Sequence, residues 1–593
     1  MTHAATPTDP SDARWDAKAI AATLILAVVT AATYCRVVSH RFTWWDDHMT
    51  LHHNPRYNPP SGQKIRETWL KPVDGLYAPL TYTYWGALAY LAELPEADDA
   101  GIHLDARIFH AGSLILHLLA VLVVFAILKL LSQNVWASLG GALLFALHPV
   151  QVEAVAWASG AKDLLCGLLS LCAIYQYLRF AKLERDRTRE RWTCYASGAV
   201  LLLLAMLAKP AAMVVPAIVA VLDILVVGRP WRKALPCAGG WAVVVLPLAV
   251  IARVAQTADN VSDVAFWQRP LIACDAIAFY LWKLVWPANL TPDYARRSAI
   301  VLSMWGGAGV YMIATVPAAI AIYVWRRWNR WPWVAAGSIL FVAAIAPVLG
   351  LTPFMFQYTS NVADHYLYLA MFGPALLLTW LMVRYPQRFV RAGLGVAIVV
   401  LAVRANVQLS FWRDDATLWA HTMRISPDSF VAPSNLAADL GRQGYALGLR
   451  AEDLREQGKS AEAARLIALQ RRDWERAVEL LERSIAIRPN YIVARQNAFI
   501  DYLRLGNYAK AVEHLEFMLA ANEAAPPERR SNFNTYHDAA GNLWMKLGRY
   551  DKAIAHYEKL LAAVPDHAGA KQGLAEARRK RAAEARIDPA ARE

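Results

Sequence analysis

Cysteine is scarce in this chain and shows no pairing pattern. Only six of the 593 residues are cysteines, and all six lie in or beside apolar segments without the spacing of metal ligands. This pattern argues against a disulfide-rich secreted domain and against a cysteine-based zinc site. We expect the six thiols to be free.

The sequence also lacks the signatures of common soluble enzymes. It contains no P-loop, no GxGxxG opening a βαβ unit, no GxSxG and no HExxH. His48, His52 and His53 lie close together, but their spacing is not diagnostic of a metal site, and scattered loop histidines are the better interpretation. The net charge is +13, yet the basic residues sit in short loops between apolar segments, so nucleic acid is not an expected partner.

What the chain has in abundance is long apolar runs, up to about residue 410. Hydrophobic residues make up 57% of the chain, above the ~45–50% of soluble proteins. A spanning helix needs roughly 20 apolar residues. Eleven segments are candidates: 18–38, 107–131, 135–156, 163–180, 193–208, 210–227, 235–254, 300–324, 334–351, 366–383 and 392–410. We predict an all-α protein in which residues 18–410 form a polytopic membrane domain of about 11 spans, the first being a retained anchor.

Four short basic loops set the expected orientation. Loops rich in arginine and lysine stay cytoplasmic, and these are 179–191, 229–233, 326–330 and 384–391. Residues 1–17 are then cytoplasmic, and the loop 39–106 lies outside. The apolar stretch 266–287 carries Arg269, Asp275 and Lys283 and would break the alternation if it crossed, so we predict a helix in the outer interface or a re-entrant element. The odd number of spans places the C-terminal domain outside.

After residue 410 the composition becomes charged and rich in alanine and leucine, and a repeat emerges. Segments 412–427, 474–489, 508–523 and 550–565 align without gaps, and Trp474 and Tyr508 are 508 − 474 = 34 residues apart. A period of 34 with aromatic, Ala and Pro at fixed offsets resembles tetratricopeptide repeats (TPRs). We predict a TPR α-solenoid over 411–578 whose groove binds a partner, and a disordered tail over 579–593. The alternative is an array that only positions the membrane domain.

Ionisable residues gather at the predicted outer ends of the spans. Adjacent Asp46 and Asp47 follow two tryptophans in the first external loop, where an apolar wall would hold one of them near neutral pKa, as a general base requires. A solvated acidic cluster at a helix end is an equal alternative. Further candidates for substrate binding are His148, Glu153, Lys162, Asp163, Lys209, Arg296, Arg297 and His365. Interfacial helix caps and snorkelling side chains are the alternative for these.

Seven stretches, taken in order, carry a resemblance to a known family. They are WWDDHMTLHHNP, YAPLTYTYWGAL, LLFALHPVQVEAVAWASGAKDLL, LAKPAAMVVP, YLWKLVWPANLTPDY, NVADHYLYL and FWRDDATLW. The chain resembles bacterial multi-spanning proteins with C-terminal TPRs. These are similar to the eukaryotic transmembrane-and-TPR O-mannosyltransferases and, more distantly, to the protein O-mannosyltransferases, all of the GT-C glycosyltransferase class.

The resemblance implies an inverting transfer of a sugar from a polyprenyl-phosphate donor to an acceptor hydroxyl, with protein O-glycosylation favoured. It implies a bacterial inner membrane location with the TPR domain outside, and membrane lipids and a protein or peptide acceptor as partners. Asp46 is the first choice for the base and Asp47 the second. Lys162 lies at a position where relatives often carry Arg or Lys. Arg296, Arg297 and His365 are further candidates for binding the donor phosphate, although relatives often carry Arg at the place of His365.

We expect no cofactor and no metal site, because the adjacent aspartates lack a DxD spacing; a divalent metal is the less favoured alternative. Two other functions stay open. One is a non-catalytic TPR membrane scaffold for envelope or pilus assembly, which would be expected to lose the Asp pair or the phosphate-binding cations. The other is a polymerase or ligase of lipid-linked glycans.

Overall fold

The computed structural model describes residues 16–73, 75–97, 101–184, 186–255, 264–527, 530 and 534–587. Over these residues the chain is helical, and its only β structure is three isolated bridges. The predicted all-α fold is therefore confirmed. Most of the predicted cytoplasmic N-terminus (1–17) and the last six residues of the predicted tail lie outside the described residues.

The chain divides into two compact units, Met1–Ser426 and Pro427–Glu593. The first unit includes α18 (Asp415–Ile425), which we had expected to open the repeat domain. The reason is its contacts: Asp415 accepts a hydrogen bond from the Trp44 backbone N–H at 2.8 Å, and Thr291 donates to Thr422 at 2.8 Å. Each unit is described by itself below.

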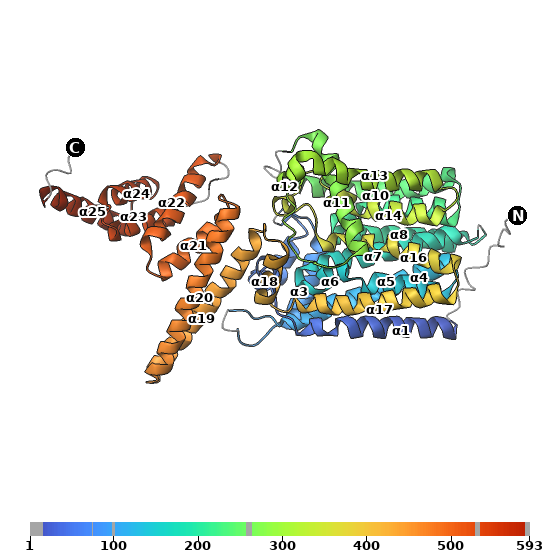
Figure 1. Ribbon diagram of the computed structural model, residues 1–593, viewed down its shortest axis with the longest axis horizontal. Coiled ribbons are helices and arrows are strands. Elements are labelled where there is room, and N and C mark those ends of the chain that lie inside the picture. Colours follow the sequence, from blue (N-terminus) through green and yellow to red (C-terminus); the bar gives the residue numbers. More distant parts are fainter. Residues whose placement is uncertain are drawn as a thin grey trace. The chain divides into compact units, whose positions relative to one another are not determined.

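The first unit is a bundle of long apolar helices (Figure 1). Eight helical stretches are long and apolar enough to cross a membrane, by length and composition. They are Ala17–Ser39 (α1 and η2), Ala106–Ser132 (α4), Ala158–Lys182 (η5 and α7), Thr188–Ala208 (α8), Pro210–Val227 (η6, α9 and η7), Trp231–Ala255 (α10), Ser298–Arg327 (α12, η9 and α13) and Arg388–Ser410 (α17).

The other three predicted spans are broken or short. Val135–Leu147 (α5) and Pro149–Ala156 (η4 and α6) meet at a 50° bend, and Asp364–Ala370 (η12 and α15) meets Phe372–Arg384 (α16) at 49°. The third, Pro332–Val348, consists of α14 (Pro332–Ile345) and η10. Each of the eleven predicted segments thus coincides with a helical stretch, and the structure supports eight spans, or ten if each bent pair is one span.

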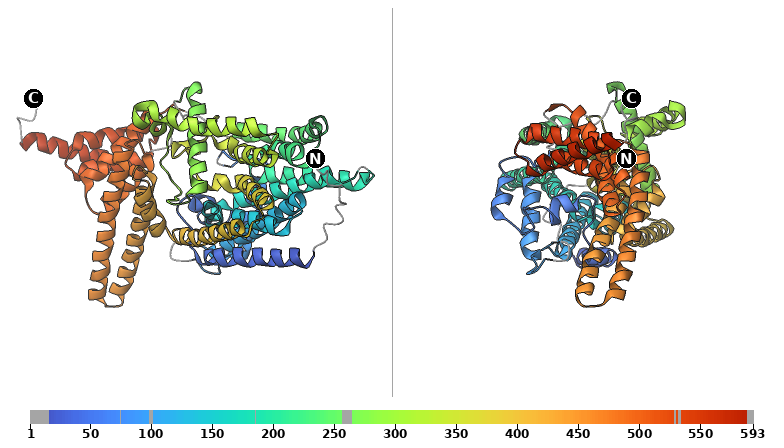
Figure 2. Two further views of the ribbon diagram at one scale, coloured as in Figure 1. Left: turned by 45° about the vertical axis from the view of Figure 1, so that its right-hand side comes forward. Right: turned by 90° about the vertical axis from the view of Figure 1, so that its left-hand side faces the viewer.

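Helix α11 (Arg269–Val285) differs from the spans. It is not among the helices that qualify as spans, and Figures 1 and 2 show it running across the direction of the bundle. One side buries Asp275 and Tyr280, while Trp282 is 58% and Val285 78% exposed. A helix that runs across the bundle and exposes Trp282 and Val285 is compatible with an interfacial or re-entrant element, which stays a prediction.

Glycines allow the helices that carry the site to pack closely. A Cβ atom on Gly373 would lie 2.4 Å from the carbonyl oxygen of Gly337, and a Cβ on Gly141 would lie 2.6 Å from that of Ala375. Small residues let helix backbones approach in this way. The bent pair ending in α16 is therefore held firmly against α5 and α14, and this fixes the segment from which His365 projects.

The second unit is a row of helix pairs. Its helices are α19 (Val431–Glu456), α20 (Ser460–Ile487), α21 (Ile492–Arg504), α22 (Tyr508–Ala524), α23 (Asn534–Lys546), α24 (Tyr550–Ala563) and α25 (Ala568–Ile587). The tail expected to be disordered from residue 579 is helical up to Ile587, where Ala, Arg and Glu favour helix. Arg578 and Arg581 also pair with Glu558 and Asp551 on α24, each at 2.8 Å.

A polar cluster recurs between successive repeats. Glu482 accepts hydrogen bonds from Tyr502 at 2.9 Å and from His514 at 3.3 Å. Glu516 accepts equivalent bonds from Trp544 at 2.6 Å and from His556 at 2.8 Å.

The two clusters occupy corresponding repeat positions. The glutamates are 516 − 482 = 34 residues apart, and the histidines 556 − 514 = 42 residues apart, which is one period plus an eight-residue insertion. Each glutamate therefore links its own repeat to the next one.

Candidate active site

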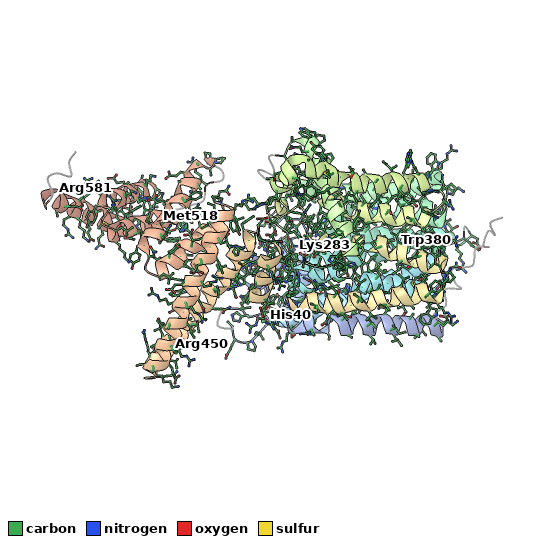
Figure 3. The ribbon with its side chains drawn as sticks, in the orientation of Figure 1. His40, Lys283, Trp380, Arg450, Met518 and Arg581 are labelled. Atoms are coloured by element: carbon green, nitrogen blue, oxygen red, sulfur yellow. The ribbon has the colours of Figure 1, made fainter. Side chains whose placement is uncertain are left out.

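The predicted site residues lie at one end of the membrane unit, called here the site end. Helices α4 and α7 begin there and α5 and α8 end there, whereas the four basic loops follow or precede the opposite helix ends. Figure 3 labels His40 and Lys283 at the site end and Trp380 at the other. Because the helices alternate in direction, residues far apart in the sequence meet at this end.

The Asp47 side chain is buried, and both of its carboxylate oxygens accept hydrogen bonds. The side chain is 0% exposed. Oδ1 accepts hydrogen bonds from the backbone N–H and hydroxyl of Ser159 at 2.9 and 2.5 Å, and Oδ2 accepts from the N–H and hydroxyl of Thr43 at 2.9 and 3.2 Å. Burial raises the pKa of Asp47 to about 6, while these hydrogen bonds act in the opposite direction. Asp47 thus ties the first external loop to the turn before α7.

Replacing Asp47 with alanine is expected to lower the free energy of unfolding by about 1–3 kcal/mol, because buried donors on Thr43 and Ser159 lose their acceptor. The measurement is the denaturation midpoint of the purified protein in detergent at pH 7. Ser159→Ala, which removes one of the four donors, should give a smaller decrease. An unchanged midpoint for Asp47→Ala would contradict the tying role.

The same residue predicts a pH effect with a definite sign. The folded pKa of about 6 exceeds the ordinary 3.8, so the folded protein takes up the proton first as the pH falls. The contribution of Asp47 to stability is therefore largest below about pH 4 and decreases as the pH rises to about 6. When the free energy of unfolding is measured against pH for wild type and Asp47→Ala, the variant should lack the decrease between about pH 4 and pH 6.

Asp46 has the opposite character. It is partly buried, and its carboxylate has no hydrogen-bond partner among the described residues. Its backbone carbonyl accepts from the N–H groups of Met49 and Thr50 at 3.0 and 2.9 Å, which fixes the residue in a helical turn. The backbone therefore fixes the position of Asp46, and its carboxylate makes no hydrogen bond within the part of the chain that the structure describes.

Lys162 is a partly buried cation at the same end of the unit. Its ammonium group makes no hydrogen bond to the described residues and lies 4.4 Å from the centre of the Trp157 ring. Asp46, Lys209 and Asp163 are charged groups close enough to act on Lys162 electrostatically. A cation–π contact holds a cation in place without using its hydrogen bonds, so Lys162 retains its donors for a ligand.

Asp163 and Lys209 form an ion pair beside Lys162. Lys209 Nζ lies 2.5 Å from Asp163 Oδ1, with 16% and 8% of the two side chains exposed. A cavity of about 40 Å³ adjoins the pair. Its lining residues are Asp163, Cys166, Gly167, Lys209, Ala211, Ala344, Pro347, Val348, His365, Tyr366, Tyr368 and Leu369.

Glu153 and His365 form a second buried pair at the same place. Glu153 Oε1 lies 2.7 Å from His365 Nδ1, and Oε2 accepts from the backbone N–H groups of Asp364 and His365 at 2.9 and 3.3 Å. Glu153 therefore fixes both the backbone and the ring of His365. The ring borders the cavity and also contacts Trp157, with centroids 5.4 Å apart.

Three predicted residues are occupied elsewhere. Arg296 makes a bidentate ion pair with Asp275 on α11, and His148 Nε2 contacts the Leu284 carbonyl at 3.1 Å. Both contacts anchor α11, so the structure gives Arg296 and His148 structural partners in place of a ligand. Arg297 lies next to Arg296 at the start of α12 and is also engaged.

Sequence reasoning missed three contributors to the site. Trp157 contacts the Lys162 ammonium group, Ser159 donates a hydrogen bond to Asp47, and Tyr366 lines the cavity. Their position in the sequence was the available signal, since Trp157 and Ser159 lie in the stretch LLFALHPVQVEAVAWASGAKDLL that also contains Lys162 and Asp163. In the part of the chain that the structure describes, no group of three or more His, Cys, Asp or Glu residues is arranged to hold a metal ion.

The fold and the site define a class: an integral membrane protein with a polytopic helical unit, a repeat unit and an acid–cation site at one end of its helices. A tetratricopeptide repeat family model matches residues 535–567, which cover α23 and α24. The predicted TPR fold of this region is thereby confirmed.

Similar curated proteins name a more particular family. Protein O-mannosyl-transferase Tmtc2 of Drosophila melanogaster is 29% identical over 117 residues, covering 20% of this chain and 12% of that protein. Human protein O-mannosyl-transferase TMTC4 is 34% identical over 167 residues, covering 26% and 21%. Protein O-mannosyl-transferase F38B6.6 of Caenorhabditis elegans is 22% identical over 451 residues, covering 71% and 60%.

The predicted resemblance to O-mannosyltransferases with TPRs is thus confirmed as sequence similarity. The matched regions span less than two thirds of each of these three relatives' own length. A solved oligosaccharyltransferase of Archaeoglobus fulgidus aligns with 70% of this chain and 56% of its own at 13% identity and a TM-score of 0.36, a likeness too weak to carry an argument.

Proposed function

We propose that this protein is a membrane glycosyltransferase that moves a sugar from a polyprenyl-phosphate donor to an acceptor hydroxyl, with a protein as the favoured acceptor. The observation that carries the proposal is the presence of two oppositely charged groups, Asp46 and Lys162, that interact electrostatically. One is a carboxylate and the other an ammonium group, both are partly buried, and neither has a hydrogen-bond partner among the described residues. The names of the similar proteins support the same reaction class.

Asp46 is the base in this proposal. It accepts the proton of the acceptor hydroxyl while the hydroxyl oxygen attacks the anomeric carbon from the side opposite the phosphate. The bond between the anomeric carbon and the phosphate oxygen breaks, and the configuration inverts. Asp47 does not compete for this role, because both of its oxygens accept hydrogen bonds from Thr43 and Ser159.

Lys162 stabilises the leaving group. Negative charge develops on the phosphate as its bond to the sugar breaks, and a fixed cation in a water-poor site stabilises that charge strongly. Trp157 holds the ammonium group from one side, so little reorganisation is needed as the charge grows. The His365 ring, oriented by Glu153 at 2.7 Å, borders the same region as a second polar group.

The proposed location follows from charge. The four basic loops lie at the helix ends opposite the site end, and basic loops remain cytoplasmic. The site end then faces the extracytoplasmic side of a bacterial inner membrane, where a lipid-linked donor presents its phosphate at the bilayer surface. The TPR unit recruits the acceptor or a partner on that side, and no metal or other cofactor takes part in the proposed reaction.

The test is a transfer assay with the full-length protein in lipid vesicles. Polyprenyl-phosphate mannose labelled in the sugar is the donor probe, and an extract of envelope proteins from a deletion strain supplies acceptors. Label should move to protein and be absent when GDP-mannose replaces the lipid donor. Transfer from GDP-mannose alone, or no transfer from any polyprenyl-phosphate sugar, would overturn the proposal. Comparing the glycoproteomes of the deletion strain and its parent then identifies the acceptor.

A further inference from the structure

We propose that Asp163 recognises the sugar being transferred, by accepting a hydrogen bond from one of its hydroxyl groups in the cavity beside Lys209. This inference rests on the proposed function and assigns part of its substrate specificity to one oxygen atom. Four observations lead to it: an unpartnered buried oxygen of Asp163, a cavity whose lining includes Asp163, the charge of the groups there, and the place of Asp163 beside Lys162.

The first observation is the state of the two carboxylate oxygens. Oδ1 of Asp163 is bound to Lys209 at 2.5 Å. Oδ2 is buried and has no hydrogen-bond partner in the described part of the chain, and only 8% of the side chain is exposed. Buried carboxylate oxygens without a partner are costly, so Oδ2 requires a donor that the described residues do not supply.

The second observation is the cavity that Asp163 helps to line. The cavity has a volume of about 40 Å³, which is room for about three water-sized groups. It is too small for a whole hexose ring and large enough for one hydroxyl-bearing edge. Its wall is apolar along Ala344, Pro347 and Leu369 and polar at Asp163, Lys209 and His365, as expected of a pocket that orients a ligand through few polar contacts.

The third observation is the sign of the charge. Asp163 and Lys209 form an ion pair in the cavity lining, and Oδ2 of Asp163 keeps the acceptor character of a carboxylate oxygen. A hydroxyl group has a proton to donate to this oxygen, whereas an ionised phosphate oxygen or sugar carboxylate has none. The cavity therefore fits a neutral sugar bearing a hydroxyl at the recognised position, and it disfavours a uronic acid with its carboxylate at that position.

The fourth observation is the order of residues on α7. Lys162 and Asp163 are consecutive, so their side chains leave the helix about 100° apart. The phosphate and the sugar edge of a sugar phosphate are likewise adjacent groups. With the phosphate at Lys162, the neighbouring hydroxyl edge falls toward Asp163 and the cavity that it lines.

The experiment compares a parent donor with its deoxy analogues in wild-type protein and in Asp163→Asn. The probes are polyprenyl-phosphate mannose and its 2-, 3-, 4- and 6-deoxy forms. For the wild type, one analogue should lose roughly ten- to a hundredfold in kcat/KM, the loss expected for a hydrogen bond to a charged group. For Asp163→Asn, the parent should fall by a similar factor and that analogue should be used nearly as well as the parent.

The ratio of kcat/KM for the parent donor to kcat/KM for the deoxy analogue distinguishes sugar recognition by Asp163 from a structural role. If Asp163 only stabilised the fold, its substitution would slow the parent and all analogues equally, and an unchanged ratio would overturn the inference. Wild-type protein alone provides a second test that does not depend on the folding of the variant. If wild type transfers mannose but no analogue loses more than twofold, the inference fails while the proposed function stands. If wild type transfers no sugar from any lipid donor, both fail.

Discussion

Replacing Asp46 with asparagine is expected to reduce the rate of sugar transfer by about 10²–10⁴-fold, the range that a positioned general base contributes. Asparagine keeps the size of the side chain and removes its ability to accept the proton. Because the Asp46 carboxylate has no hydrogen-bond partner among the described residues, the substitution should leave the denaturation midpoint close to the wild-type value. The measurement is kcat with saturating polyprenyl-phosphate mannose.

Two variants provide the controls for Asp46. Asp47→Asn alters the neighbouring carboxylate and should retain more transfer, about tenfold below wild type, because Asp47 acts through the position of the loop. Glu67→Gln removes an exposed carboxylate from α2 (Gly62–Glu67) in the same external loop and should leave transfer unchanged. Full activity in Asp46→Asn, or a larger loss in Asp47→Asn, would reverse the assignment of the base.

Replacing Lys162 with methionine is expected to lower kcat by about 10²–10³-fold, the usual cost of removing one group that stabilises developing charge. Methionine preserves the apolar stem that lies against Trp157, so the packing is largely maintained. The loss should appear in kcat more than in KM, because the interaction strengthens as the phosphate departs. Steady-state kinetics with varied donor concentration separates the two parameters.

Arginine and an exposed lysine test the reason for this loss. Lys162→Arg keeps the positive charge and should recover a large part of the activity. Lys71→Met removes an exposed lysine from the same side of the protein and should have no effect. Equal activity of Lys162→Met and wild type would show that another group neutralises the phosphate.

The fold was largely predictable because its signals are strong and local. Runs of about twenty apolar residues specify spans without knowledge of tertiary contacts, and each predicted span coincides with a helical stretch. The bends at His148 and Met371 could not be located in the same way, because they depend on how the broken helices pack. The boundary of the repeat domain could not be located from the sequence either, because α18 has a repeat-like sequence. Its contacts with Thr291 and Trp44 place it in the membrane unit.

The composition of the site was predictable, but the roles of its members were not. The sequence presents Asp46 and Asp47 as equivalent neighbours. Only the four hydrogen bonds from Thr43 and Ser159 distinguish them, and Ser159 is 112 residues from Asp47 along the chain. The external arginines posed the same difficulty, because the partner of Arg296, Asp275, lies in a different helix.

The repeated polar clusters of the second unit make the order of its repeats matter. Each glutamate belongs to one repeat, and the histidine and aromatic side chain that bind it belong to the next. Each of these two junctions therefore has a glutamate acceptor on one repeat and the matching hydrogen-bond donors on the next. A unit inserted to lengthen this array would have to carry both the glutamate and the histidine. The glutamate would lie eight residues, and the histidine six residues, after the aromatic residue that begins the aligned segment, as Glu516 and His514 do after Tyr508. A unit lacking either residue would interrupt the array at a single, predictable joint.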